Sequence, residues 1–94
     1  MKHCLIALRL KPDFADAHNN LGALCKDLNM YDEAVKQYLI AVKLRPDLAD
    51  AHFNLGFVYY QMGQIENARR ELIEGLKIKP EEPRAQQLLK AVNR

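Results

Sequence analysis

Apolar residues along this 94-residue chain recur every three or four positions, which is the spacing of one face of an α-helix. In residues 15–28 that face consists of Ala17, Leu21, Leu24, Cys25 and Leu28. The same spacing predicts further helices at about 1–11, 31–45, 49–62, 65–79 and 83–93. No stretch alternates apolar and polar residues as a half-buried strand does, so the pattern predicts an all-α fold.

The predicted helices are followed by residues that end a helix. Pro12, Pro46 and Pro80 each follow one, and proline cannot continue a helix because it has no N–H to donate. Asn29 and Gly63 follow the helices at 15–28 and 49–62, and both residue types accept the left-handed conformation that ends many helices. The connections are therefore short, which favours antiparallel neighbours.

The chain also repeats itself. Residues 11–22 (KPDFADAHNNLG) return as residues 45–56 (RPDLADAHFNLG), an offset of 34 positions without a gap. A repeat of this length predicts a stack of helix pairs in which each pair contacts its neighbours. We expect one domain, residues 1–94, with the second helix of a truncated repeat at 1–14, complete repeats at 15–48 and 49–82, and a C-terminal capping helix at 83–94.

Gly22 and Gly56 occupy the same position in the two repeats, inside predicted helices. A glycine there costs about 1 kcal/mol relative to alanine, so its recurrence indicates a structural requirement. The simplest requirement is the close approach of another helix. Small residues at matching positions of the second helices fit this interpretation: Ala34, Ala41, Ala68 and Gly75.

Composition excludes several classes of function. The net charge of +2 is too small to favour nucleic acid or an anionic membrane as partner, and no apolar run approaches the length of a membrane span. Ser and Thr do not occur, which excludes Ser-His-Asp hydrolysis and a phosphate loop that ends in Ser or Thr. Cys4 and Cys25 make no disulfide framework, so a cytoplasmic location is the default expectation. We expect no enzymatic activity, no cofactor and no small-molecule substrate.

The repeated residues resemble the tetratricopeptide repeat, whose pattern is W-x2-L-G-x2-Y, A-x3-F and P over 34 residues. The first copy is His18-x2-Leu21-Gly22-x2-Cys25, Ala34-x3-Tyr38 and Pro46. The second copy is His52-x2-Leu55-Gly56-x2-Tyr59, Ala68-x3-Leu72 and Pro80. The resemblance implies a right-handed α–α superhelix of antiparallel helix pairs whose first helices line a concave groove. It also implies a non-catalytic interaction module that binds a peptide or a partner helix in that groove.

Asn20 and Asn54 each stand directly before Leu-Gly. They are similar to the asparagine ladder that holds peptide backbone in the repeat superhelix of O-linked N-acetylglucosamine transferases. An asparagine amide can both donate to and accept from a main-chain amide. The Lys/Arg pairs by which other family members hold a C-terminal carboxylate are absent, since their places hold Asp16, Asn19, Asp50 and Asn54.

Phe53, Phe57 and Tyr60 form the strongest candidate for a contact surface. Their spacing of four and three puts them on one side of a helix, away from its core-facing residues. Exposed aromatic side chains provide a large apolar contact area at binding surfaces. The alternative is that the helix at 83–93 covers part of this row. Around it we predict a polar rim made of Asp16, Lys26, Asp50, Arg84 and Gln87, and Asn19 is a further predicted residue of the groove.

The remaining histidine, cysteine and basic residues are predicted to have structural roles. His18 and His52 stand at a usually aromatic core position without an acidic or Cys ligand at metal-binding spacing, so we predict packing and no metal. Cys25 is predicted to be a buried, inert thiol. Four basic residues lie at helix C-termini, where the helix dipole accounts for them without a nucleic-acid partner: Lys43, Arg45, Lys77 and Lys79.

The first predicted helix suggests an alternative function. In an intact array another helix would cover the face that carries Cys4 and Leu8, and Leu5 adds further apolar surface. The end of a solenoid normally presents polar residues to water. The alternative is therefore a structural, self-associating fragment of a longer array that forms a homodimer through Cys4, Leu5 and Leu8.

Overall fold

The structure is a computed structural model of the chain and describes residues 14–93. Within this range lie the helices α2 (Phe14–Asp27), α3 (Tyr31–Leu44), α4 (Ala49–Gln61), α5 (Ile65–Ile78) and α6 (Pro83–Val92), and these residues form no strand. The predicted all-α class is confirmed, and each of these helices has almost its predicted limits. The predicted helix at 1–11 lies outside the described residues.

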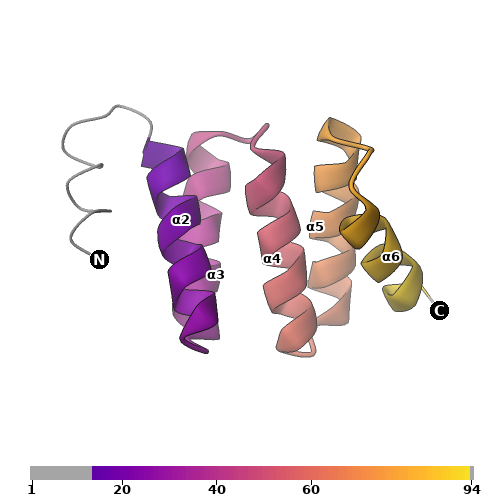
Figure 1. The fold of residues 1–94 in the computed structure, drawn as a ribbon, viewed down its shortest axis with the longest axis horizontal. Helices are drawn as coiled ribbons and strands as arrows, with labels where there is room; N and C mark the ends of the chain where they lie inside the picture. The colour runs from indigo at the N-terminus through magenta and orange to yellow at the C-terminus, as the bar shows by residue number, and fades with distance from the viewer. Residues whose placement is uncertain (1–13, 94) are drawn as a thin grey trace.

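The helices form two antiparallel pairs and one additional helix. α2 packs against α3 and α4 packs against α5, while contacts between α3 and α4 join the two pairs and α6 packs against α5. In Figure 1, α2, α4 and α6 lie toward the viewer, and α3 and α5 lie behind them. We call the surface formed by the front helices the α2–α4–α6 face. This arrangement is the α–α superhelix that the repeat predicted.

The turns within the two pairs have the same geometry. Asn29 and Gly63 have φ angles of 61° and 80°, as their predicted left-handed role requires. In the first turn the Met30 N–H donates to the Cys25 carbonyl over 2.8 Å, and in the second the Gln64 N–H donates to the Tyr59 carbonyl over 2.8 Å. These bonds satisfy carbonyl groups that the end of each helix would otherwise leave unpaired.

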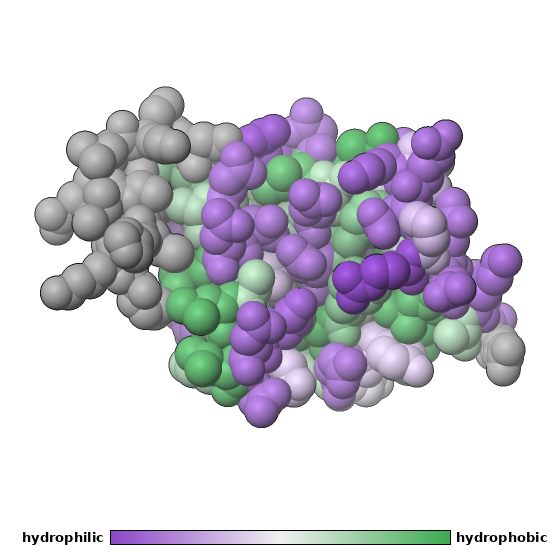
Figure 2. Space-filling model, viewed as in Figure 1, coloured by the Kyte–Doolittle hydropathy of each residue, from purple (hydrophilic) through white to green (hydrophobic). Residues whose placement is uncertain are grey.

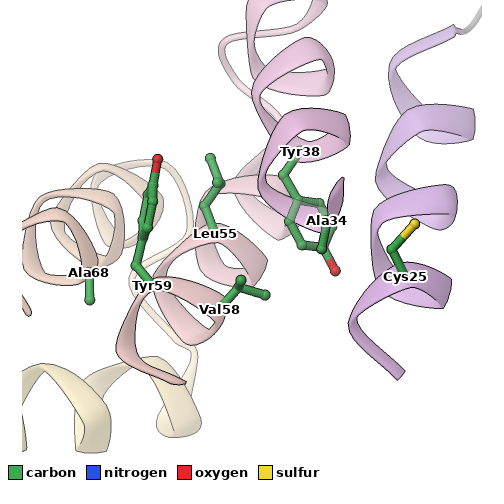
Figure 3. Close-up of a cluster of buried hydrophobic side chains, with 7 residues drawn as sticks. All are labelled: Cys25, Ala34, Tyr38, Leu55, Val58, Tyr59 and Ala68. Atoms are coloured by element: carbon green, nitrogen blue, oxygen red, sulfur yellow. The ribbon is translucent and has the colours of Figure 1, made fainter. Parts of the chain in front are cut away.

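The first core cluster consists of small and large side chains from α2, α3, α4 and α5 (Figure 3). Its buried members are Cys25, Ala34, Tyr38, Leu55, Val58, Tyr59 and Ala68. Two members, Ala34 and Ala68, are among the small residues that the repeat predicted to allow close helix approach. Gly22 and Gly56 are also buried, and a Cβ on Gly56 would stand 2.8 Å from the side chain of Leu72. The interpretation of the repeated glycines is therefore confirmed.

The two repeated histidines link the helices of each pair. His18 Nδ1 lies 2.7 Å from Gln37 Oε1, and His52 Nδ1 lies 2.9 Å from Glu71 Oε1. Gln37 and Glu71 are themselves one repeat apart, so the second repeat reproduces the link with a carboxylate. His52 Nε2 also lies 2.9 Å from the carbonyl oxygen of Pro46. Among residues 14–93, no group of three or more His, Cys, Asp and Glu side chains could hold a metal ion.

Candidate functional site

Two neighbouring hollows formed by the described residues open on the α2–α4–α6 face. The larger hollow, of about 720 Å³, is lined by Lys26, Asp27, Asn29, Tyr31, Phe57, Tyr60, Gln61, Arg84, Gln87, Leu88 and Ala91. The smaller hollow, of about 260 Å³, is lined by Asn19, Asp50, Phe53, Asn54, Phe57, Glu82 and Arg84. Figure 2 shows the same side of the molecule, where hydrophilic side chains predominate and apolar patches lie between and beside them.

Phe57 and Arg84 line both hollows and therefore stand where the hollows meet. The guanidinium carbon of Arg84 lies 5.1 Å from the centre of the Phe57 ring, a cation–π contact. Arg84 comes from the first turn of α6 and Phe57 from α4, so this contact joins the two helices across the face. Helix α6 is thus a wall of the hollows in addition to its predicted role as a cap.

The structure brings most of the predicted groove residues together. Lys26, Phe57, Tyr60, Arg84 and Gln87 line the larger hollow. Asn19, Asp50, Phe53 and Asn54 line the smaller one. Asn20, also predicted for the groove, is exposed on α2 and lines neither hollow. The predicted self-association residues Cys4, Leu5 and Leu8 lie outside the described residues.

The prediction that Phe53 is an exposed member of the aromatic row is wrong. Only 4% of Phe53 is exposed, and it belongs to a second core cluster with Leu72 and Ala85 of α5 and α6. Its ring fills the space beside Gly75, where a Cβ would stand 2.5 Å from a ring carbon of Phe53. Phe57 is half-buried against the same cluster, whereas Tyr60 is 41% exposed. The three aromatic side chains therefore range from buried to exposed. This agrees with the alternative that the helix at 83–93 covers part of the row.

Asn54 pairs with Asn19 of the preceding first helix. The Asn54 amide nitrogen donates to the Asn19 side-chain oxygen over 3.0 Å, across the contact between α4 and α2. The partner is thus Asn19 and not Asn20, which occupies the position of Asn54 one repeat earlier. The bond leaves the Asn54 carbonyl oxygen and the Asn19 amide nitrogen available at the wall of the smaller hollow.

Asp16, predicted for the polar rim, has a different contact. Its carboxylate lies 3.5 Å from the guanidinium of Arg45, which follows α3. Both side chains are largely exposed, and such a pair stabilises a fold by roughly 0–1 kcal/mol. Asp16 lines neither hollow, so it joins α2 to the end of α3 rather than contributing to the candidate site.

Among residues 14–93, the ionisable groups with shifted pKa values lie in the core and line neither hollow. Burial raises the pKa of the Cys25 thiol, and the Glu33 carboxylate adds to this shift. Burial likewise raises the pKa of Tyr38 and of Tyr59. A raised pKa keeps the thiol in its unreactive neutral form. The hollows thus offer amides, exposed charges and apolar surface, which are the groups of a binding site.

The fold is that of a helical-repeat protein, and two hollows open on one of its faces. Two family models match the chain: a TPR repeat model over residues 24–63 and a tetratricopeptide repeat model over residues 49–82. The chain belongs to the tetratricopeptide repeat family, as its sequence pattern predicted. Such repeats are protein–protein interaction modules, and this is the general class of the chain. No helix in the described part of the chain is long and apolar enough to cross a membrane.

Solved structures resemble nearly the whole chain. The crystal structure of MamA is 26% identical with a TM-score of 0.87, over 97% of this chain and 53% of that one. A mutant O-GlcNAc transferase of Thermobaculum terrenum is 32% identical with a TM-score of 0.87, over 97% of this chain and 18% of that one. The chain thus spans about half of the first protein and under a fifth of the second. No curated protein matches the chain.

Proposed function

We propose that the α2–α4–α6 face binds an extended peptide segment of a protein partner, without catalysis. The observation that carries this proposal is the pair of adjoining hollows, which share Phe57 and Arg84 and are lined by residues of α2, α4 and α6 together with Tyr31 of α3. A surface built from several helices and hollowed in this way is suited to a continuous segment that passes from one hollow to the next.

The Asn19–Asn54 pair favours an extended segment over a helical one. Its remaining donor and acceptor lie at the smaller hollow and suit a main-chain amide. A helical partner has already satisfied most of its own main-chain groups, whereas an extended one presents them to its receptor. Amide side chains continue along the larger hollow as Asn29, Gln61 and Gln87.

Apolar contact would come from Tyr60, Phe57 and Leu88 in the larger hollow. Tyr60 is the most informative of these, because it is 41% exposed and outside both core clusters. Phe57 contacts the second core cluster, so its removal affects folding as well as binding. The charged side chains around the hollows, Lys26, Asp50 and Arg84, would set which segments are accepted.

Selection of peptides from a random displayed library tests the proposal. The affinity of a selected peptide is then measured with the wild-type chain and with Tyr60→Ala. Loss of an aromatic anchor typically weakens binding by about 1–2 kcal/mol. Leu39→Ala is the matched control, because Leu39 is 44% exposed on α3 and lines neither hollow. Equal losses for the two variants, or a loss for Leu39→Ala alone, would contradict the proposal.

A further inference from the structure

We infer that the partner segment carries a basic and an acidic residue, three to five positions apart, with a large apolar residue between them. This inference rests on the proposed function and specifies the chemistry of the partner. It follows from an unequal distribution of charge between the two hollows and from the distance that separates their charged side chains.

The smaller hollow has an excess of acidic groups. Asp50 from the first turn of α4 and Glu82 directly before α6 both line it. Neither carboxylate forms an ion pair with any residue of 14–93. Arg84 lines the same hollow with its guanidinium over the Phe57 ring, and its one positive charge still leaves one negative charge in excess. The two carboxylates are therefore placed to attract a basic side chain of the partner.

The larger hollow has an excess of basic groups. Lys26 and Arg84 line it from opposite sides, and Asp27 is the single acidic residue among its lining residues. Neither Lys26 nor Arg84 forms an ion pair within the described part of the chain. Contact with the Phe57 ring holds the guanidinium without using its N–H groups, which remain able to donate to a carboxylate.

The helix register gives the spacing between the two charges. The Asn54–Asn19 bond places these residues opposite each other, so Gln61 stands opposite Lys26, seven positions further along each helix. On α4, Phe57 marks the position of Arg84 and Gln61 marks the position of Lys26. Helix α4 rises about 10 Å from Asp50 to Phe57 and about 16 Å from Asp50 to Gln61, at 1.5 Å per residue. An extended chain advances about 3.3–3.6 Å per residue, so these lengths correspond to about three to five residues.

A set of short synthetic peptides with blocked ends tests the inference. The parent peptide is Gly-Lys-Ala-Phe-Ala-Glu-Gly, and Gln replaces Lys, Glu or both in the other three. Exposed charge contacts contribute roughly threefold each in affinity. We therefore expect the parent to bind about tenfold more tightly than the doubly neutral peptide, in titrations followed by backbone amide NMR shifts. A peptide of the same composition with Lys and Glu adjacent should lose most of this gain.

Charge-neutral variants assign each partner residue to its hollow. Lys26→Gln should reduce the gain from the peptide Glu, because only Arg84 remains to attract it, and should keep the gain from the peptide Lys. The double variant Asp50→Asn and Glu82→Gln should do the reverse. Asp47→Asn is the control, because Asp47 is exposed before α4 and lines neither hollow. Circular dichroism verifies that each variant is folded.

The outcomes separate this inference from the proposed function. If all four peptides bind equally and Tyr60→Ala weakens them all, the inference is wrong and the proposed function stands. If none of them binds while library-selected peptides do, the inference is again wrong. If the library also yields no peptide whose binding depends on Tyr60, the proposed function is contradicted and the inference falls with it.

Discussion

The ring of Tyr38 lies directly against Gly22: a Cβ on this glycine would stand 2.6 Å from a ring carbon of the tyrosine. Tyr38 is fully buried and is among the largest side chains in the core. Its ring cannot move aside as the end of a flexible side chain could. The first pair of helices is therefore held at a separation that only glycine permits at position 22.

Gly22→Ala should destabilise the fold. Forcing a methyl group into this contact costs about 1–3 kcal/mol, whereas the higher helix propensity of alanine returns about 1 kcal/mol. We expect a net loss of up to about 2 kcal/mol in the free energy of unfolding, measured by urea denaturation. A more stable variant would show that helix propensity outweighs the contact and that α2 and α3 can separate at little cost.

Gly63 is required for a different reason. A Cβ there would meet nothing within 4 Å, but its φ of 80° is one that other residues rarely adopt. Gly63→Ala should cost about 1–2 kcal/mol of stability. Gly63→Asn should cost less, because Asn29 occupies the equivalent turn with a φ of 61°. Equal losses for the two variants in thermal unfolding would contradict this explanation.

Tyr38 also predicts how stability changes in alkaline solution. Burial raises the pKa of its phenol, with the charges of Asp27 and Cys25 adding to the shift. The unfolded chain therefore releases this proton first, so stability is complete below the ordinary tyrosine pKa of about 10 and falls as the pH rises above it. Tyr38→Phe should reduce this fall, which urea denaturation at a series of alkaline pH values measures.

The same substitution tests the buried hydroxyl at neutral pH. The Tyr38 oxygen is buried without a hydrogen-bond partner among the described residues. Removal of an unsatisfied buried hydroxyl is nearly neutral or stabilising, by up to about 1 kcal/mol. A loss of more than about 1 kcal/mol in Tyr38→Phe would indicate that the hydroxyl is hydrogen-bonded in solution.

The hydrogen bond between His52 and Glu71 should stabilise the fold mainly because of its geometry. The charge of Glu71 should contribute less. Both side chains are only 12% exposed, and His52 also contacts the Pro46 carbonyl. His52→Ala should cost about 1–3 kcal/mol, since it removes both bonds. Glu71→Gln should cost less, because Gln37 already accepts the equivalent bond from His18. If Glu71→Gln proves as costly as His52→Ala, the ionic character of the link is essential.

Features that depend on local sequence or on the repeat could be predicted. The helix limits follow from apolar spacing, and the turns at Asn29 and Gly63 follow from the conformations that these residue types accept. The close approach at Gly22 and Gly56 was predictable because a residue that is unfavourable in a helix recurs at one position. In each case the residues that determine the feature lie within one helix pair or recur in both repeats.

Features that depend on how successive pairs stack could not be predicted in the same way. Phe53 is core because α5 and α6 cover it, and apolar spacing within α4 does not reveal that cover. One signal was present: Gly75 replaces the Ala41 of the preceding repeat, where the larger Phe53 replaces Asn19. The Arg84–Phe57 and Asn54–Asn19 contacts likewise depend on the lateral positions of α6 and α2.

The most direct test of the proposed binding surface is to map where a library-selected peptide binds on the chain. Backbone amide NMR shifts measured during a titration report this residue by residue. We predict the largest changes at residues that line the two hollows, among them Lys26, Asn54, Tyr60 and Gln87, with little change at Leu39 and Ile73, which are exposed on α3 and α5. Changes concentrated at Leu39 and Ile73 would contradict the assignment of the α2–α4–α6 face as the binding surface.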